Sequence, residues 1–175
     1  MNAAPDVEPL LITYTLFGDL EPKTKTERAD VEWSELVARV RDSRAYPDKA
    51  ACPLISMCEY GELPSPIGGI LRHAGNVKRA YGCEFDYDGK EVSPQRAAQL
   101  LQAAGILALI HTTGRHEPGA PKWRGLLPFS EPCTPEKRAE YLARANRVLG
   151  GIATSESFTL SQSFYLGRVR GVEYI

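Results

Sequence analysis

Two aspartates separated by a single residue are the strongest chemical feature of this sequence. Asp86 and Asp88 lie in the segment FDYDG. Side chains two positions apart on a β-strand project to the same face, so the two carboxylates are expected to point the same way. Such carboxylates repel each other unless a cation lies between them, and Mg²⁺ prefers oxygen ligands of this kind together with substrate phosphates. The simpler alternative is a turn at Asp88 with a solvated Asp86 beside it.

Basic residues and a histidine surround a loop further along the chain. Arg115 and His116 close the segment TTGRH, while Lys122 and Arg124 flank the start of the next apolar stretch. If the two strands on either side of this loop are neighbours, the cations converge on one sheet edge, where they could bind a triphosphate. The alternative for His116 is an exposed or locally hydrogen-bonded side chain. His111 lies inside an apolar run and is expected to be structural.

A third polar segment, ESFTLSQ, covers residues 156–162. Glu156 is the only acid between Glu140 and Glu173. A third carboxylate from this region can therefore come only from Glu156. The alternative is that Glu156 is a solvated loop residue.

The second half of the chain alternates strands and helices that would position these residues. The expected strands cover residues 81–87, 106–112, 123–129 and 158–169. Helices are expected over 95–104 and 134–149, because N-cap residues followed by proline, Ser93-Pro94 and Thr134-Pro135, begin them. The nearly continuous apolar run 106–112 is typical of a strand buried on both faces. This order predicts an α+β fold with a split βαβ (RRM-like), mostly antiparallel sheet and two helices on one face.

Residues 1–75 are expected to form an N-terminal α/β portion packed on a catalytic core of residues 76–175, together making one compact two-lobed domain. The elements predicted for the N-terminal portion are a strand over 10–17, a helix over 33–44 and a short strand over 53–60. Charged and threonine-rich residues 21–30, and residues 62–75 with two prolines and three glycines, are predicted loops.

Composition excludes several classes of protein. A chain of 175 residues with 43% hydrophobic and 25% charged residues can bury a core, which excludes a disordered tail or a collagenous repeat. No apolar run approaches the roughly 20 residues of a membrane span, and residues 1–6 carry no export signal. We therefore expect a cytoplasmic protein without membrane contact.

Charge is unevenly distributed along the chain. The net charge of −1 argues against a histone-like binder of nucleic acid, yet residues 1–35 carry −5 and the remainder +4. A local positive surface for a polyanion is therefore compatible with the sequence. Lys137, Arg138 and Arg144 are expected on solvated helix faces.

The four cysteines are too few and too scattered for a disulfide framework, and free thiols are expected. Cys52 and Cys58 are six positions apart, wider than the usual close pair of a zinc site, with His73 as the nearest other soft ligand.

Taken together, these segments resemble the catalytic core of archaeo-eukaryotic-type primases, and more narrowly the primase-polymerase domains of phage and plasmid replication proteins. The resemblance covers residues 76–170 and depends on the order and spacing of short motifs. Asp86 and Asp88 match the family's acidic pair, and His116 ends its small-residue-x-His element. Glu156 is the nearby acid for the third element, although Ser155 precedes it where the family has a hydrophobic residue.

This resemblance implies a DNA-dependent primase or primase-polymerase, a nucleotidyltransferase that uses two-metal in-line phosphoryl transfer from nucleoside triphosphates. It implies Mg²⁺ or Mn²⁺ held by Asp86, Asp88 and Glu156, with the phosphates of the nucleotide contacted by His116. The implied catalytic residues are Asp86, Asp88 and His116. Further implied nucleotide contacts are Arg115, Lys122, Arg124, Ser161 and Gln162, and the implied contacts to DNA are Lys78 and Arg79.

The implied partners are a single-stranded DNA template and nucleoside triphosphates. A helicase region downstream, in a longer replication protein, is expected as well. Two alternatives use the same residues: a metal-dependent nuclease or phosphodiesterase, with water as the nucleophile, and a non-catalytic DNA-binding replication module.

Overall fold

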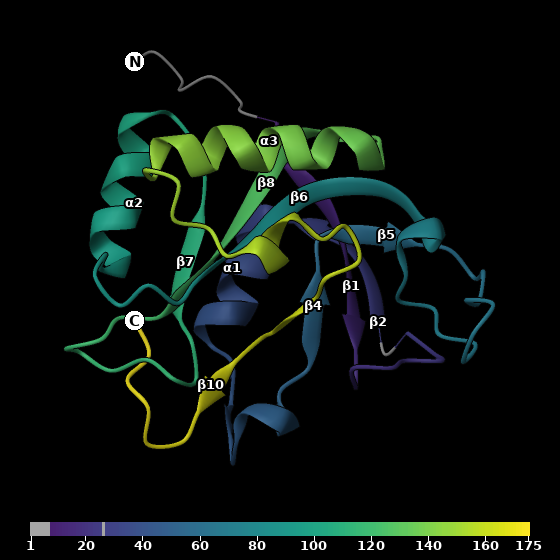
Figure 1. Ribbon diagram of the computed structural model, residues 1–175, viewed down its shortest axis with the longest axis horizontal. Coiled ribbons are helices and arrows are strands. Elements are labelled where there is room, and N and C mark those ends of the chain that lie inside the picture. The colour runs from purple at the N-terminus through teal and green to yellow at the C-terminus, as the bar shows by residue number, and fades with distance from the viewer. Residues whose placement is uncertain (1–7, 26) are drawn as a thin grey trace, which may run out of the picture.

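The computed structural model describes residues 8–25 and 27–175, so the N-terminal start at residues 1–6 lies outside the described residues. The α+β fold class predicted from the sequence is confirmed: the strands are mostly antiparallel, and three α-helices pack against them within the described residues (Figure 1). No helix in that part of the chain is long and apolar enough to cross a membrane.

The first sheet has the strand order β2-β1-β4-β9, with every neighbouring pair antiparallel. Its strands are β1 (Leu11–Phe17), β2 (Glu27–Glu32), β4 (Leu54–Ser56) and β9 (Phe164–Tyr165). Helix α1 (Trp33–Arg41) buries Leu36 and Val40 against Ile12 and Tyr14 of β1. The apolar residues whose spacing predicted the helix therefore form the face that packs on this sheet.

The second sheet has the order β5-β6-β8-β7 and is antiparallel throughout. Its strands are β5 (Cys58–Tyr60), β6 (Val77–Tyr87), β7 (Leu109–Thr112) and β8 (Trp123–Cys133). Helices α2 (Pro94–Ala103) and α3 (Pro135–Val148) cover one face of this sheet, as Figure 1 shows. Two helices on one face of an antiparallel sheet is the arrangement that the strand and helix order predicted.

The two sheets exchange strands across the predicted division at residue 75. Strand β5 comes from the first 75 residues and pairs with β6 of the second sheet. Strand β9 comes from the last part of the chain and pairs with β4 of the first sheet. A two-residue parallel pair, β3 (Ala45–Tyr46) with β10 (Arg168–Val169), adds a further link. The division into two portions itself stays a prediction.

Both helix starts predicted in the second half of the chain coincide with the N-terminal ends of observed helices. The Ser93 hydroxyl accepts a hydrogen bond of 3.1 Å from the Arg96 backbone N–H, which is the cap that the sequence predicted for α2. Helix α3 begins at Pro135, but the Thr134 side chain makes no cap hydrogen bond there. The start of α3 is therefore stabilised by the proline in its first turn and by the backbone hydrogen bond from the Lys137 N–H to the Thr134 carbonyl.

Three predicted elements were wrong. Residues 158–169 are not one strand, because they form the end of a 3₁₀ turn η3 (Ser155–Phe158), a loop, and the short strands β9 and β10. Part of the predicted loop 21–30 is strand β2. Its Ala29 and Val31 pack on the hydrophobic core between the first sheet and α1, and they alternate with charged side chains. The run 106–112 contributes only edge strand β7, and Leu107 before it is 51% exposed.

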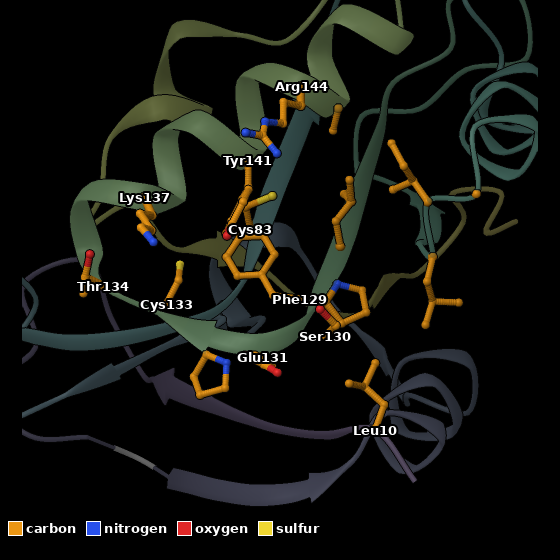
Figure 2. Close-up of a pocket in the computed structure, with 17 residues that line it drawn as sticks. Leu10, Cys83, Phe129, Ser130, Glu131, Cys133, Thr134, Lys137, Tyr141 and Arg144 are labelled. Carbon is orange, nitrogen blue, oxygen red and sulfur yellow. The ribbon is translucent and has the colours of Figure 1, made fainter. Parts of the chain in front are cut away.

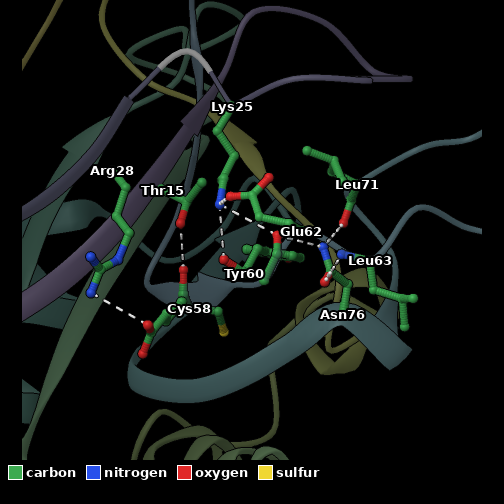
Figure 3. A network of polar contacts seen from close by, with 11 residues as sticks. Thr15, Lys25, Arg28, Cys58, Tyr60, Glu62, Leu63, Leu71 and Asn76 are labelled. Carbon is green, nitrogen blue, oxygen red and sulfur yellow. Dashed lines mark hydrogen bonds and ion pairs between the residues drawn. The ribbon is translucent and has the colours of Figure 1, made fainter.

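A polar network holds the long connection between β5 and β6 (Figure 3). The Lys25 ammonium donates to the carbonyl of Tyr60 and forms an ion pair with Glu62. The fully buried Asn76, at the end of 3₁₀ turn η2 (Ala74–Asn76), donates 2.8 Å to the Leu71 carbonyl and accepts 3.0 Å from Leu63 N–H. Side-chain hydrogen bonds therefore help to order a segment whose described part has η2 as its regular element.

A buried ion pair joins α3 to β6. The Arg138 side chain is 1% exposed and donates 2.7 Å to Oε2 of Glu84, which is 0% exposed. Arg138 also donates 3.1 Å to the Ser157 carbonyl in η3, and Oε1 of Glu84 accepts from the Met57 backbone N–H. The prediction of a solvated Arg138 was therefore wrong, since this arginine ties α3, β6 and η3 together.

The structural role expected for His111 agrees with its burial, and it predicts a pH dependence of stability. Nδ1 donates 3.0 Å to the Thr112 carbonyl, and the ring packs 5.6 Å from that of Tyr174. Burial, and then the positive charge of Arg124, lowers the pKa of His111 to about 4.

Because the folded pKa lies below the unfolded value of about 6.5, the unfolded chain binds a proton first as the pH falls. We expect the free energy of unfolding in urea to decrease by about 2 kcal/mol between pH 7 and pH 5 through this residue. A His111→Phe variant should lose that part of the dependence while keeping the ring packing. An unchanged slope between these pH values in the variant would contradict the assignment.

Candidate functional site

The alternation of side chains along β6 separates its core face from its polar face. Cys83, Phe85 and Tyr87 pack beneath α2 and α3. Asp86 and Asp88 occupy the alternate positions and therefore point away from these helices. Both line one pocket of about 230 Å³, as the period of a strand predicts.

We call this cavity the aspartate pocket. Its lining combines three carboxylates with two cations and several hydroxyl and aromatic side chains. The lining residues are Leu20, Lys49, Asp86, Asp88, Arg124, Thr154, Glu156, Gln162, Ser163, Phe164 and Tyr165. The predicted residues that meet here are thus Asp86, Asp88, Arg124, Glu156 and Gln162.

Asp86 is neutralised by Arg124 from the neighbouring strand β8. Nε and Nη2 of Arg124 donate to Oδ1 of Asp86 at 2.9 and 2.6 Å. The arginine side chain is 5% exposed, donates 2.6 Å to the Tyr165 carbonyl and lies 4.6 Å over the ring of Phe164. The hydrogen bonds of Arg124 therefore go to Asp86 and to Tyr165 of β9. The sequence interpretation had instead expected Arg124 to bind a triphosphate.

Asp88 has a looser arrangement at the end of the strand. Its carboxylate is 55% exposed and lies 3.3 Å from Nζ of Lys122. Within the described residues each aspartate of the pair thus has its own cation from β8 or the residue before it. The repulsion expected of paired carboxylates is relieved in this way by the protein itself.

The segment around η3 lies along the edge of β6 at Asp86. The Asp86 backbone N–H donates 3.0 Å to the Ser157 hydroxyl, and its carbonyl accepts 3.1 Å from the Thr154 N–H. Glu156, between these two residues, is exposed at the pocket. Backbone and hydroxyl hydrogen bonds within η3 lower the pKa of Glu156, whereas the charge of Asp88 acts in the opposite direction.

His116 is not among the residues that line the aspartate pocket. Its side chain is buried, and Nδ1 accepts 3.3 Å from the Lys122 backbone N–H. Nε2 lies 3.9 Å from a carboxylate oxygen of Glu173. Arg115, in the same loop, is exposed, and its charge contributes to lowering the pKa of Lys49. The nucleotide contacts predicted for His116 and Arg115 stay predictions.

The remaining predicted residues lie further from the aspartates. Lys78 and Arg79 are exposed at the start of β6. Asp86 lies eight positions after Lys78 along the strand, about 26 Å at ~3.3 Å per residue. Ser161 is half-buried, and its carbonyl accepts 3.1 Å from Nη1 of Arg72. The structure does not bring these three side chains into the aspartate pocket.

Lys49 and Ser163 are two of the pocket residues that the sequence interpretation missed. Lys49 lies in the 3₁₀ turn η1 (Lys49–Ala51), with Nζ 4.9 Å from the ring centre of Tyr165. Ser163 immediately precedes β9, and its buried hydroxyl has no hydrogen-bond partner in the described structure. A lone lysine outside any motif carries no sequence signal. Ser163 was missed because a strand was predicted over 158–169, whereas this residue lies in the loop before β9.

The donor set fits a divalent cation only in combination with a ligand. Both hydrogen bonds from Arg124 go to Oδ1 of Asp86. Within the described residues Oδ2 has no hydrogen-bond partner, so it can bind a ligand. No three or more acidic, histidine or cysteine side chains of residues 8–25 and 27–175 form a metal-holding group. Mg²⁺ is commonly held by one or two carboxylates and completed by waters and substrate phosphates, which the aspartate pair fits.

A larger groove lies elsewhere on the molecule, between α3 and the far part of β8 (Figure 2). Its volume is about 730 Å³, and its walls include Phe129, Cys133 and Tyr141, with Lys137 and Arg144 beside them. The described residues that line it include none of the predicted site residues. Size alone would select this groove, whereas the predicted site residues Asp86, Asp88 and Glu156 line the smaller aspartate pocket.

Comparisons with known proteins give limited information. No family model and no curated protein sequence matches the chain. Among solved structures, the chain is similar to the polymerase domain from Mycobacterium tuberculosis ligase D in complex with DNA, with 16% sequence identity and a TM-score of 0.39. The similarity covers 94% of this chain and 56% of that one. A likeness at this level leaves the function to be argued from the chain's own residues.

Proposed function

We propose that this protein is a nucleotidyltransferase that adds nucleotides to a DNA-templated strand, as a primase or primase-polymerase does. The observation that carries the proposal is that Asp86 of β6 and Asp88, which directly follows the strand, line one pocket with Lys49 and Arg124. Carboxylates beside cations suit a substrate whose negative phosphates must be bound next to the groups that hold its metal. The motif order that resembles primases supports the same activity.

In this proposal Asp86 and Asp88 hold Mg²⁺ or Mn²⁺ together with the phosphates of the nucleotide. The metal supplies charge neutralisation at the phosphates and activation of the attacking 3′-hydroxyl. Glu156 reaches the same pocket from η3 and is proposed as a third carboxylate. Its longer side chain compensates for its position on a turn beside the strand.

The remaining residues position the pair and its substrate. Arg124 fixes the rotamer of Asp86 from β8, and Lys122 does the same more loosely for Asp88. Gln162 lines the pocket and is proposed to contact the nucleotide, as are Ser161, Arg115 and His116. Lys78 and Arg79, exposed at the far end of β6, are proposed to meet phosphates of a single-stranded template.

The test is incorporation of labelled nucleotides on single-stranded DNA with Mg²⁺ or Mn²⁺, with and without a primer. We expect template-dependent extension products, and Asp88→Asn should reduce them at least about tenfold, which corresponds to ~1.4 kcal/mol of transition-state stabilisation. Asp88 is exposed, so this substitution should leave the unfolding curve unchanged.

Degradation of the labelled template without incorporation would replace the proposal by a metal-dependent nuclease or phosphodiesterase. DNA binding with neither reaction would assign a non-catalytic replication module. The assay compares ribonucleotides with deoxynucleotides in the same series, since the pocket residues do not distinguish the two. A downstream helicase region in a longer phage or plasmid protein, and a cytoplasmic location, belong to the same proposal.

A further inference from the structure

Lys49 is the cation of the aspartate pocket that has no acidic partner. Arg124 and Lys122 are paired with Asp86 and Asp88. In the described part of the chain no carboxylate lies within ion-pair distance of Lys49, which is half-buried beside the ring of Tyr165. A partly buried lysine without a counter-charge is unfavourable unless a ligand supplies one.

The positive charges of two arginines act on this lysine. Burial lowers the pKa of Lys49, and the charges of Arg124 and then Arg115 lower it further. Asp86 and Asp88 act in the opposite direction without cancelling the effect. An anion bound beside Lys49 would remove this strain between like charges.

Ser163 provides a second, independent indication of a ligand. Ser163 lines the aspartate pocket, and its buried hydroxyl has no hydrogen-bond partner in the described structure. An unpaired buried hydroxyl costs free energy, and a ligand oxygen would satisfy it. Lys49 and Ser163 are 114 positions apart in the sequence and reach the pocket from η1 and from the loop before β9.

The size of the pocket limits what it can hold. Its volume of about 230 Å³ lies below the roughly 300–1,000 Å³ of pockets that enclose a whole small-molecule ligand. It therefore suits one end of a ligand, such as a chain of phosphates, with the remainder outside.

We propose that Lys49 and Ser163 bind the phosphate groups of the nucleoside triphosphate in the aspartate pocket. This inference rests on the proposed function and assigns phosphate binding to two residues that the sequence analysis did not name as site residues. Arg124 is paired with Asp86, and His116 is not among the residues that line the pocket. The triphosphate is the ligand, rather than the backbone of DNA, because the reacting phosphate must lie beside Asp86 and Asp88.

The test is calorimetric titration of the full chain with inorganic tripolyphosphate and Mg²⁺. Lys49→Met should raise the Kd at least tenfold, and Lys49→Arg should restore most of the affinity by keeping the charge. Ser163→Ala should raise the Kd about threefold. It should leave the Tm unchanged or higher, because it removes an unpaired buried hydroxyl. Lys137→Met, an exposed lysine of α3, is the matched control and should bind like the wild type.

The same variants are titrated with a single-stranded oligonucleotide and assayed for incorporation. Unchanged tripolyphosphate affinity in a folded Lys49→Met variant overturns the inference. Loss of oligonucleotide affinity in its place also overturns it and makes the DNA backbone the ligand. If the wild type incorporates no nucleotide while tripolyphosphate binding still depends on Lys49, the proposed function fails and this phosphate site stands.

Discussion

Replacing Arg138 with methionine is expected to lower the free energy of unfolding by about 3–5 kcal/mol, the usual cost of removing one partner from a buried ion pair. The variant leaves the Glu84 carboxylate fully buried without its counter-charge. It also removes the donor to the Ser157 carbonyl, which holds η3 in place. With total stabilities of about 5–15 kcal/mol for single domains, this is a large fraction of the whole. Urea unfolding followed by circular dichroism measures the difference.

The control for this prediction lies on the same helix. Arg144 is exposed, forms an ion pair with Glu140 one turn away and lies 5.5 Å from the ring centre of Tyr141. Arg144→Met should therefore change stability by less than about 0.5 kcal/mol. Combining Arg138→Met with Glu84→Gln should recover part of the loss, because the glutamine carbonyl is neutral and still accepts from Met57 N–H. Equal effects of the Arg138 and Arg144 substitutions would contradict the role of the buried pair.

Asp86→Asn is expected to reduce nucleotide incorporation at least about 100-fold, equivalent to ~2.7 kcal/mol of transition-state stabilisation. The substitution removes the negative charge that faces metal and phosphates but keeps a carbonyl oxygen for Arg124. Alanine is the less informative change, since it would leave the buried guanidinium of Arg124 without two of its hydrogen bonds. Initial rates at several Mg²⁺ concentrations give the measurement.

Asp42→Asn provides the comparison, because Asp42 is an exposed aspartate whose ion-pair partner, Arg41, is also exposed. That variant should incorporate nucleotides at the wild-type rate. Full activity of Asp86→Asn with Mg²⁺ would remove the aspartate pair from the chemistry. Loss of activity together with loss of the folded state would be visible in the unfolding curves, which separate the two causes.

Local signals in the sequence were sufficient for several elements. Ser93-Pro94 and Thr134-Pro135 predicted where α2 and α3 begin, because capping and proline effects act within one helical turn. The two-residue period of a strand predicted that Asp86 and Asp88 share a face, and both line one pocket. Each of these predictions depends only on neighbours along the chain.

Predictions that depend on tertiary partners were less successful. Nothing in the sequence around Arg138 distinguishes it from Arg144, and only the position of Glu84 makes one buried and the other exposed. The aromatic residues of 158–169 favour a strand locally, but the chain turns at Gly167, whose φ of 124° suits glycine. Lys49 gains its place in the pocket from contacts with Tyr165, more than 100 residues away.

The pairing of β4 with β9 has a consequence for synthesis of the chain. Leu54 pairs with Tyr165 and Ile55 with Phe164, so the first sheet stays incomplete while the intervening residues are made. At about 5–20 residues per second, translation leaves the edge of β4 unpaired for roughly 5–20 s. An open strand edge is a site for pairing with other chains. The nascent chain is therefore vulnerable to aggregation during this interval, and the residues that close the edge are the same ones that complete the wall of the aspartate pocket.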